Sequence, residues 1–145
     1  MPILAVERIR LQATAKNKAD AIRQAGQLLV DSGCVHARYV DGMLAREETM
    51  STYLGNGVSI PHGQFDNRED IFQTGISVLQ LPDGVEWEDG EKAYLVIGIA
   101  ASSDEHVGVL ANLAEVIEDE EMTLKLIRTT DPRLILDQLS KEQTV

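Results

Sequence analysis

The first third of the chain carries apolar residues at the spacing of amphipathic helices. Between Asn17 and Gly33 they recur at intervals of three and four residues, as Ile22, Ala25 and Leu29. Because Asn is a favoured N-cap and Gly a favoured helix stop, this pattern predicts a helix that begins at Asn17 and ends near Gly33. A second helix is predicted over about residues 37–48, with an apolar face formed by Tyr39, Val40, Met43 and Leu44.

The middle of the chain carries strand patterns instead. Residues 58–60 alternate as a short strand should, and they lie among glycines and a proline. Residues 74–81 form a longer pattern, which is predicted to end in a turn at Pro82-Asp83-Gly84 because these residue types favour turns. Residues 93–101 are apolar on both faces, which predicts a central strand covered by helices on both sides of the sheet.

Helical patterns return in the last third of the chain. Ser102 and Glu105 have the spacing of a capping box at a helix start, and another helix is predicted over about residues 121–128. A last helix is predicted to begin at Asp131-Pro132, since Pro favours the first helical position. The order of helices, strands and helices predicts an α/β domain with a mixed sheet. No repeat or linker-like segment interrupts it, so residues 1–145 are expected to form one domain.

The charge balance narrows the class of partner. The chain has 24 Asp and Glu against 13 Lys and Arg, a formal net charge of −11. Because nucleic acids and anionic membranes are bound mainly through Lys and Arg, this charge argues against both. It favours basic or mixed-charge protein partners, although solubility alone explains an acidic surface equally well.

The expected compartment is the cytoplasm. Cys34 is the single cysteine, so no internal disulfide forms, as in a reduced cytosolic protein. No apolar run reaches the ~20 residues of a membrane span, and the N-terminal sequence lacks the pattern of a signal peptide. We therefore expect no membrane insertion.

His62 is the first candidate for chemistry. It follows the short strand and stands between Pro61 and Gly63, at a strand end where α/β proteins expose functional side chains. Gly63 also has no Cβ that would obstruct an approaching partner. A histidine that only caps the strand by hydrogen bonding explains the local sequence about as well.

His106 and Arg46 are the other candidates. His106 lies in the expected first turn of a helix, where backbone N–H groups favour an anion, and Arg46 lies near the end of the second predicted helix. Each also has an ordinary structural reading, as a packed histidine and as a cation at a helix C-terminus. Together with His62 they suit phosphoryl transfer, because a neutral imidazole is nucleophilic and the other groups stabilise the phosphoryl oxygens. The sequence has no P-loop, no complete dinucleotide fingerprint and no zinc motif, so neither a cofactor nor a metal is expected.

Short motifs along nearly the whole chain carry a family resemblance. They are Arg46-Glu47, Thr52-Tyr53-Leu54-Gly55, Ile60-Pro61-His62-Gly63, Ile97-Gly98-Ile99-Ala100-Ala101 and Glu105-His106. In this combination the sequence resembles the mannitol/fructose-type enzyme IIA domains (EIIA type 2) of the bacterial phosphoenolpyruvate-dependent sugar phosphotransferase system. Residues 98–106 resemble the fructose- and mannitol-type proteins. The Ala-Arg-Glu-Glu and Leu-Gly-Asn-Gly segments and residues 100–106 are most similar to the fructose branch, with mannitol as the second choice.

The resemblance implies a fold, an activity and partners. The fold would be a three-layer α/β/α arrangement, with a mixed, about five-stranded sheet between helices. The chain would be a phosphotransferase in which His62 matches the phosphorylated histidine, His106 the second active-site histidine and Arg46 the arginine that helps hold the phosphoryl group. The donor would be phospho-HPr or an HPr-like domain, and the acceptor a cysteine of a fructose- or mannitol-specific enzyme IIB domain.

Two other functions stay open on the sequence. A regulatory binding module of the nitrogen-regulatory IIA type would also accept phosphate, but it would use its phosphorylation state to switch protein contacts. A metal-dependent hydrolase built on His62 and His106 would require bound zinc. Fast transfer to an enzyme IIB domain separates the carrier from the regulator, and full activity without metal separates it from the hydrolase.

Overall fold

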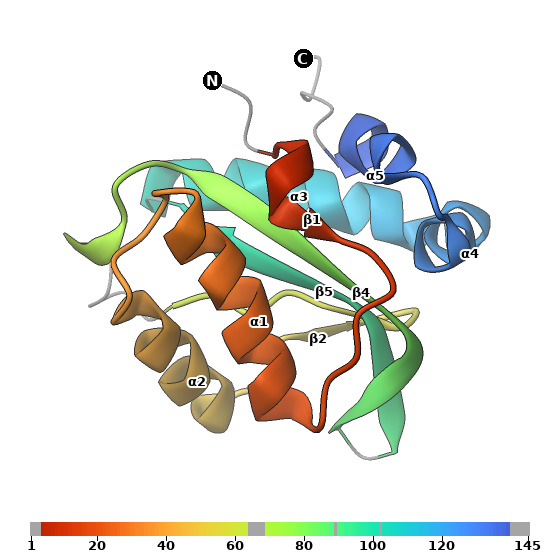
Figure 1. The fold of residues 1–145 in the computed structure, drawn as a ribbon, viewed down its shortest axis with the longest axis horizontal. Helices are drawn as coiled ribbons and strands as arrows, with labels where there is room; N and C mark the ends of the chain where they lie inside the picture. The colour runs from red at the N-terminus through yellow and green to blue at the C-terminus, as the bar shows by residue number, and fades with distance from the viewer. Residues whose placement is uncertain (1–3, 64–68, 89, 102, 140–145) are drawn as a thin grey trace.

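The computed structural model describes residues 4–63, 69–88, 90–101 and 103–139, and the side chains of residues 103–107 lie outside the description. Within these ranges a five-stranded mixed sheet lies between two layers of helices (Figure 1). The strands are β1 (Ile9–Arg10), β2 (Tyr53–Gly55), β3 (Val58–Ser59), β4 (Gly75–Glu88) and β5 (Glu91–Ala100). The expected three-layer α/β/α fold with a mixed, five-stranded sheet is therefore confirmed.

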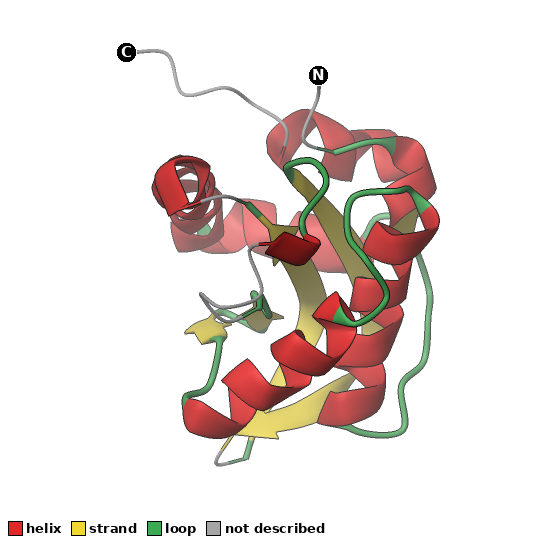
Figure 2. Cartoon of the chain, turned by 90° about the vertical axis from the view of Figure 1, so that its left-hand side faces the viewer, coloured by secondary structure: helices red, strands yellow, loops and turns green. Residues whose placement is uncertain are grey.

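The helices cover both faces of the sheet, as the view from the side shows (Figure 2). In chain order they are the short 3-10 helix η1 (Val6–Arg8), α1 (Lys18–Asp31), α2 (Tyr39–Thr49), α3 (Ser103–Glu118), α4 (Glu120–Arg128) and α5 (Pro132–Leu139). One apolar cluster joins α1 and α2 to the sheet, and a second joins α3, α4 and α5 to its other face. None of the described helices combines the length and the apolar composition that a membrane crossing requires.

The start of α1 agrees with the sequence pattern. The Asn17 side chain accepts a hydrogen bond from the backbone N–H of Asp20 at 2.9 Å, which is the predicted N-cap. Gly33 follows the helix with φ +79°, a left-handed conformation that glycine adopts without steric cost. The capping box predicted at Ser102 and Glu105 lies outside the described residues.

The strand order β1-β4-β5-β3-β2 places β5 in the middle of the sheet, as its apolar sequence predicted. β5 pairs antiparallel with β4 and parallel with β3, while β1 runs parallel to β4. Because β3 and β5 are parallel, their carboxyl ends meet at the same edge of the sheet. The chain leaving β3 reaches that edge at His62, which forms an isolated bridge with Ile99 of β5.

The turn predicted at Pro82-Asp83-Gly84 is wrong. β4 continues through these residues to Glu88, and its pairing with β5 shifts register between Gln80 and Val85. A β-bulge accommodates an unpaired proline and a positive-φ glycine without ending the strand, and Gly84 has φ +73°. β1 and β2, of two and three residues, were not predicted at all.

Candidate functional site

His62 lies at the sheet edge where β3 and β5 end, and its backbone is fixed from two sides. The N–H of Ile99 donates to the carbonyl of Pro61 at 3.0 Å, which ties the segment to the central strand. On the other side, the N–H of Gly63 donates to the hydroxyl of Tyr39 at 2.9 Å. The Pro-His-Gly motif therefore has a defined backbone conformation, with the His62 ring about half buried.

The imidazole of His62 has a defined tautomer. Its Nδ1 lies 2.9 Å from the carbonyl oxygen of Ile60, and because a carbonyl only accepts, Nδ1 carries the proton. The lone pair is then on Nε2, the nitrogen that acts as a nucleophile. A non-reacting nitrogen that keeps its proton on an acceptor is what phosphoryl transfer through histidine requires.

The surroundings also set the charge of the His62 ring. Burial lowers the pKa of His62 below its ordinary value, and the hydrogen bond to Ile60 opposes this shift. The positive charge of Arg46 lowers the pKa further, whereas the negative charge of Glu47 raises it. The net result is a ring that is neutral, and hence nucleophilic, at neutral pH.

Arg46 lies near the end of a helix, as the sequence predicted. It lies in the last turn of α2, and its Nη1 donates to the carbonyl of Met50 at 2.7 Å. Its charge acts on His62 across the space between α2 and the end of β3. The structure thus places Arg46 where its charge influences the imidazole of His62.

His106 is located only through its backbone. It lies in the first turn of α3, which follows directly on β5 and therefore starts at the sheet edge that holds His62. Its side chain lies outside the described residues, so its contacts with His62 remain a prediction.

Tyr39 is a site residue that the sequence analysis placed only on an apolar helix face. Its hydroxyl accepts from Gly63 and donates to the carbonyl of Ile99 at 2.9 Å, so it joins the histidine segment to β5. Burial raises the pKa of Tyr39 to about 12, which keeps the hydroxyl protonated as a donor. A Cβ on Gly63 would lie 2.6 Å from the Tyr39 ring, so this contact requires glycine. A tyrosine on a buried helix face is the available sequence signal, since its hydroxyl must find partners.

Glu47 is the second residue whose role was missed. It is only 5% exposed although it belongs to a helix whose charged residues normally face water. Its carboxylate accepts hydrogen bonds from Thr52 and from the indole of Trp87. The only signal in the sequence is its place beside Arg46 in a family motif.

The described residues contain no group of three or more His, Cys, Asp or Glu side chains that is arranged to hold a metal ion. The hydrolase hypothesis would need His62 and His106 as ligands, and the side chain of the second lies outside the described part of the chain. Cys34 is a free, buried cysteine.

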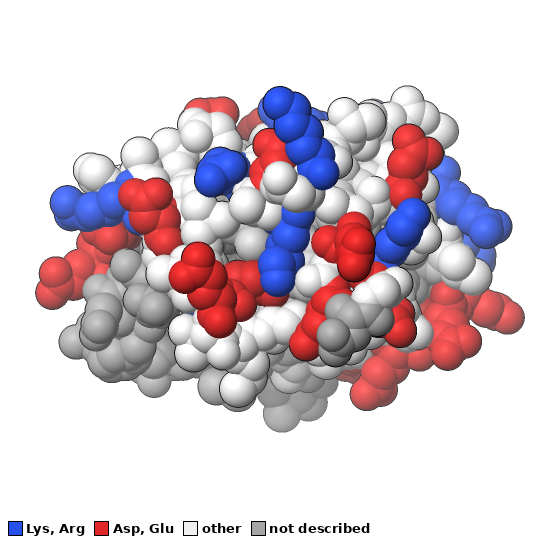
Figure 3. Space-filling model, turned by 90° about the horizontal axis from the view of Figure 1, so that it is seen from below, with Lys and Arg blue, Asp and Glu red and all other residues white. Residues whose placement is uncertain are grey.

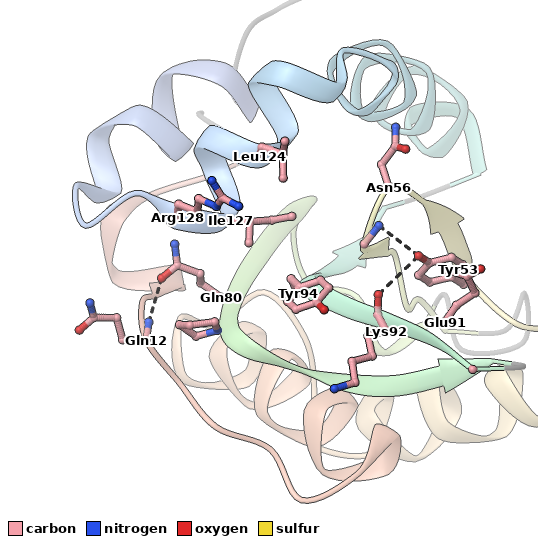
Figure 4. Close-up of a pocket in the computed structure, with 13 residues that line it drawn as sticks. Gln12, Tyr53, Asn56, Gln80, Glu91, Lys92, Tyr94, Leu124, Ile127 and Arg128 are labelled. Atoms are coloured by element: carbon pink, nitrogen blue, oxygen red, sulfur yellow. Dashed lines mark hydrogen bonds between the residues drawn. The ribbon is translucent and has the colours of Figure 1, made fainter.

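A separate cavity of about 900 Å³ lies at the other end of β5 (Figure 4). Tyr53, Lys92, Tyr94 and Arg128 are among its lining residues, so Tyr53 of the Thr-Tyr-Leu-Gly motif lines this cavity. Tyr94 and Ile99 are separated by about 16 Å along the strand, at about 3.3 Å per residue. The cavity is therefore distinct from the surroundings of His62.

Comparison with known proteins relates nearly the whole chain to one family. Residues 2–142 match the sequence profile described as phosphoenolpyruvate-dependent sugar phosphotransferase system, EIIA 2. The multiphosphoryl transfer protein of Salmonella typhimurium is 49% identical over 127 residues, which cover 88% of this chain and 34% of that protein. The mannitol-specific phosphotransferase enzyme IIA component of Geobacillus stearothermophilus is 43% identical over 141 residues, which cover 97% of each.

A solved structure gives the same relationship in three dimensions. It is the complex of enzyme IIA-Mtl with phosphorylated enzyme IIB-Mtl from Escherichia coli, which matches with a TM-score of 0.88 and 38% identity. The match covers 93% of this chain and 95% of the matched chain. By contrast, the chain spans about a third of the length of the multiphosphoryl transfer protein it matches.

Proposed function

This chain belongs to the EIIA 2 family of the phosphoenolpyruvate-dependent sugar phosphotransferase system, and from that premise we propose that it is a phosphocarrier. It takes a phosphoryl group onto Nε2 of His62 and passes it to a cysteine of a sugar-specific enzyme IIB domain. The observation that carries this proposal is the hydrogen bond from Nδ1 of His62 to Ile60, which leaves the lone pair on Nε2.

The proposed reaction is two successive displacements at phosphorus. Nε2 of His62 attacks the phosphoryl group of a donor phosphohistidine, so that the Nε2–P bond forms while the donor's N–P bond breaks. The proton stays on Nδ1 throughout, hydrogen-bonded to the carbonyl oxygen of Ile60. In the second displacement a cysteine thiolate forms an S–P bond while the Nε2–P bond breaks, which returns His62 to its neutral form.

The charged residues supply electrostatic stabilisation in this scheme. Arg46 and His106 stabilise the equatorial oxygens during each transfer, together with backbone N–H groups at the start of α3. The scheme uses no metal and no cofactor, because positioning and charge suffice for this reaction.

The partners are proposed from the relatives. The Escherichia coli enzyme IIA-Mtl forms a complex with a phosphorylated enzyme IIB, which supports an enzyme IIB domain as the acceptor here. We propose phospho-HPr or an HPr-like domain as the donor, in the cytoplasm, in keeping with the name of the multiphosphoryl transfer proteins. Fructose is the first choice of sugar on the sequence motifs, and mannitol is the second, supported by the mannitol-specific relatives.

The regulatory alternative has less support. The relatives described above are a sugar-specific transfer component and a multiphosphoryl transfer protein, whose names describe transfer rather than regulation. Fast onward transfer to a fructose or mannitol enzyme IIB domain separates the two functions, since a regulator would hold its phosphoryl group.

The test is the intact-protein mass after incubation with phosphoenolpyruvate, enzyme I and HPr. Wild type should gain one acid-labile phosphoryl group, and folded His62→Ala should gain none. His36→Ala is the matched control, because the His36 ring is exposed and its Nδ1 accepts a hydrogen bond from the backbone N–H of Arg38, and this variant should be phosphorylated as wild type is. Phosphorylation of His62→Ala, or none on wild type supplied with either HPr or an HPr-like donor domain, would contradict the proposal.

A further inference from the structure

We propose that Glu47 is a positioning residue that also sets the phosphoryl-transfer potential of His62. Its buried carboxylate holds the segment that orients the imidazole, and its negative charge opposes overly tight retention of the phosphoryl group. The inference rests on the proposed phosphocarrier function.

The carboxylate of Glu47 is surrounded by donors. Oε1 accepts from the indole Nε1 of Trp87 at 2.7 Å and from the backbone N–H of Thr52 at 3.0 Å. Oε2 accepts from the Thr52 hydroxyl at 2.5 Å, and the ammonium of Lys18 lies 3.9 Å from Oε1. An ionised carboxylate, which only accepts, satisfies all of these groups at once. Glu47 is therefore a buried negative charge with a fixed orientation.

A continuous path of hydrogen bonds leads from this carboxylate to His62. Glu47 holds Thr52 by both its N–H and its hydroxyl, and the carbonyl of Thr52 accepts the N–H of Ile60 at 3.0 Å. The carbonyl of Ile60 in turn accepts the Nδ1–H of His62 at 2.9 Å. The Ile60 carbonyl fixes the tautomer of His62, and its position thus depends on the hydrogen bonds that Glu47 accepts from Thr52.

The charge of Glu47 acts on His62 as well. Arg46 and Glu47 are neighbours in α2 and influence the imidazole with opposite signs. A phosphoryl group adds a charge of about −1.5 to −2 near neutral pH, so Arg46 stabilises the phosphorylated form while Glu47 destabilises it. A carrier must both accept and release its group, and this pair of opposite charges balances the two requirements.

Glu47→Gln separates charge from geometry. The amide oxygen replaces Oε1 toward Trp87 and the Thr52 N–H, and the amide NH₂ then faces the Thr52 hydroxyl, which is able to accept instead of donate. Glu48→Gln is the matched control, since it removes the same formal charge from the next residue, which is exposed.

Two measurements test the proposal. At equilibrium with phospho-HPr, Glu47→Gln should shift the phosphoryl group toward the carrier by about tenfold, the equivalent of one pKa unit of charge interaction. In the unphosphorylated protein, NMR titration should give a lower pKa for His62 in Glu47→Gln than in wild type. Glu48→Gln should match wild type in both.

A folded Glu47→Gln with the wild-type equilibrium and the wild-type His62 pKa would overturn the charge role. If that variant does not fold, Thr52→Val removes only the hydroxyl bond and keeps the charge. It should slow transfer several-fold without moving the equilibrium, and an unchanged rate would overturn the positioning role. Because the titration needs no phosphoryl donor and wild type is phosphorylated in parallel, failure of this inference is distinct from failure of the phosphocarrier function.

Discussion

At the scale of single residues, the chemistry of His62 is determined by groups from elsewhere in the chain. Ile60 fixes the proton on Nδ1, Tyr39 fixes the backbone of Gly63, and Arg46 and Glu47 apply opposite charges. The histidine itself contributes only a nitrogen lone pair. Changes to these neighbours should therefore alter its reactivity in separable ways.

Arg46→Ala is expected to slow phosphoryl transfer about tenfold to a hundredfold, since removing one stabilising donor or charge commonly has effects of about this size or larger. Its side chain donates to the carbonyl of Met50 at an exposed position, so the thermal unfolding temperature should change little. Rapid-quench phosphorylation by phospho-HPr measures the rate. Wild-type transfer by the variant would show that Arg46 has no role at the site.

The lowered pKa of His62 predicts a pH dependence of stability. The unfolded histidine binds a proton below about pH 6.5, whereas the folded one resists protonation to lower pH. The free energy of unfolding should therefore fall as the pH decreases through the unfolded pKa, until the folded pKa is passed. Urea unfolding of wild type and His62→Gln between pH 7.5 and 5 isolates this effect, and parallel curves for the two proteins would contradict it.

Tyr39→Phe removes the hydroxyl that joins Gly63 to Ile99. The buried carbonyl of Ile99 and the partly buried N–H of Gly63 each lose a partner, so the free energy of unfolding should fall by about 1–3 kcal/mol. Phosphorylation of His62 should also slow, because its backbone is held less firmly. Tyr53→Phe is a matched control, since its hydroxyl makes longer bonds, to Gly57 and Lys92, at the other end of the sheet. Equal losses of stability in the two variants would contradict this account.

At the scale of elements, the sequence correctly predicted those helices and strands whose position is determined by residues within the element or directly beside it. The cap at Asn17 and the apolar run of β5 each specify their element within a few residues, and both predictions were confirmed. The strand through Pro82-Asp83-Gly84 was missed because β5 pairs with both sides of the bulge and overrides the turn preference. β1 is too short to show a pattern, and it exists because β4 offers it a parallel edge.

The residues of the candidate site also fall into two groups, those that the sequence motifs reveal and those whose role is visible only in the structure. His62, His106 and Arg46 are visible in sequence because they belong to family motifs, and the structure relates Arg46 to His62. Tyr39 acts through Gly63 and Ile99, 24 and 60 positions away, and Glu47 contacts Trp87, 40 positions away, as well as the nearby Thr52. No local pattern encodes the distant contacts.

The bulge in β4 predicts a difference between two glycines. Gly84 and Gly90 both have positive φ, but a Cβ on Gly84 would lie 2.7 Å from the Tyr94 ring, while one on Gly90 would meet nothing within 4 Å. Gly90→Ala should cost about 1–2 kcal/mol of backbone strain. Gly84→Ala should cost about 1–3 kcal/mol more, because the ring must move. Urea unfolding measures both, and equal costs would show that Tyr94 yields freely.

At the scale of the whole molecule, the chain is strongly acidic, with 24 Asp and Glu against 13 Lys and Arg. Figure 3 shows acidic and basic side chains interspersed over one face. The net charge of −11 nevertheless predicts a long-range field that favours a basic or mixed-charge partner. We therefore expect charge in this protein to influence the encounter with partners as well as the reactivity of His62.

This field predicts a salt dependence of phosphorylation. The second-order rate of transfer from phospho-HPr should fall several-fold between about 20 mM and about 500 mM salt, because the Debye length shortens from roughly 20 Å to a few ångströms. The measurement is the initial rate at low carrier concentration. A second-order rate that does not respond to salt would contradict electrostatic steering.

The first and last described elements lie against each other. α5 contacts η1, and Leu4 and Leu139 are buried in the same apolar cluster. In a longer polypeptide, segments before and after this domain would therefore connect to it at neighbouring points, without any rearrangement of its fold. A donor domain tethered there would encounter His62 at an effective concentration set by its linker, in the millimolar range for a short flexible one that spans the sites. The packing of these two terminal elements is thereby compatible with two arrangements. The domain works either as a separate carrier that diffuses between its partners, or as one domain of a longer chain that passes the phosphoryl group from domain to domain.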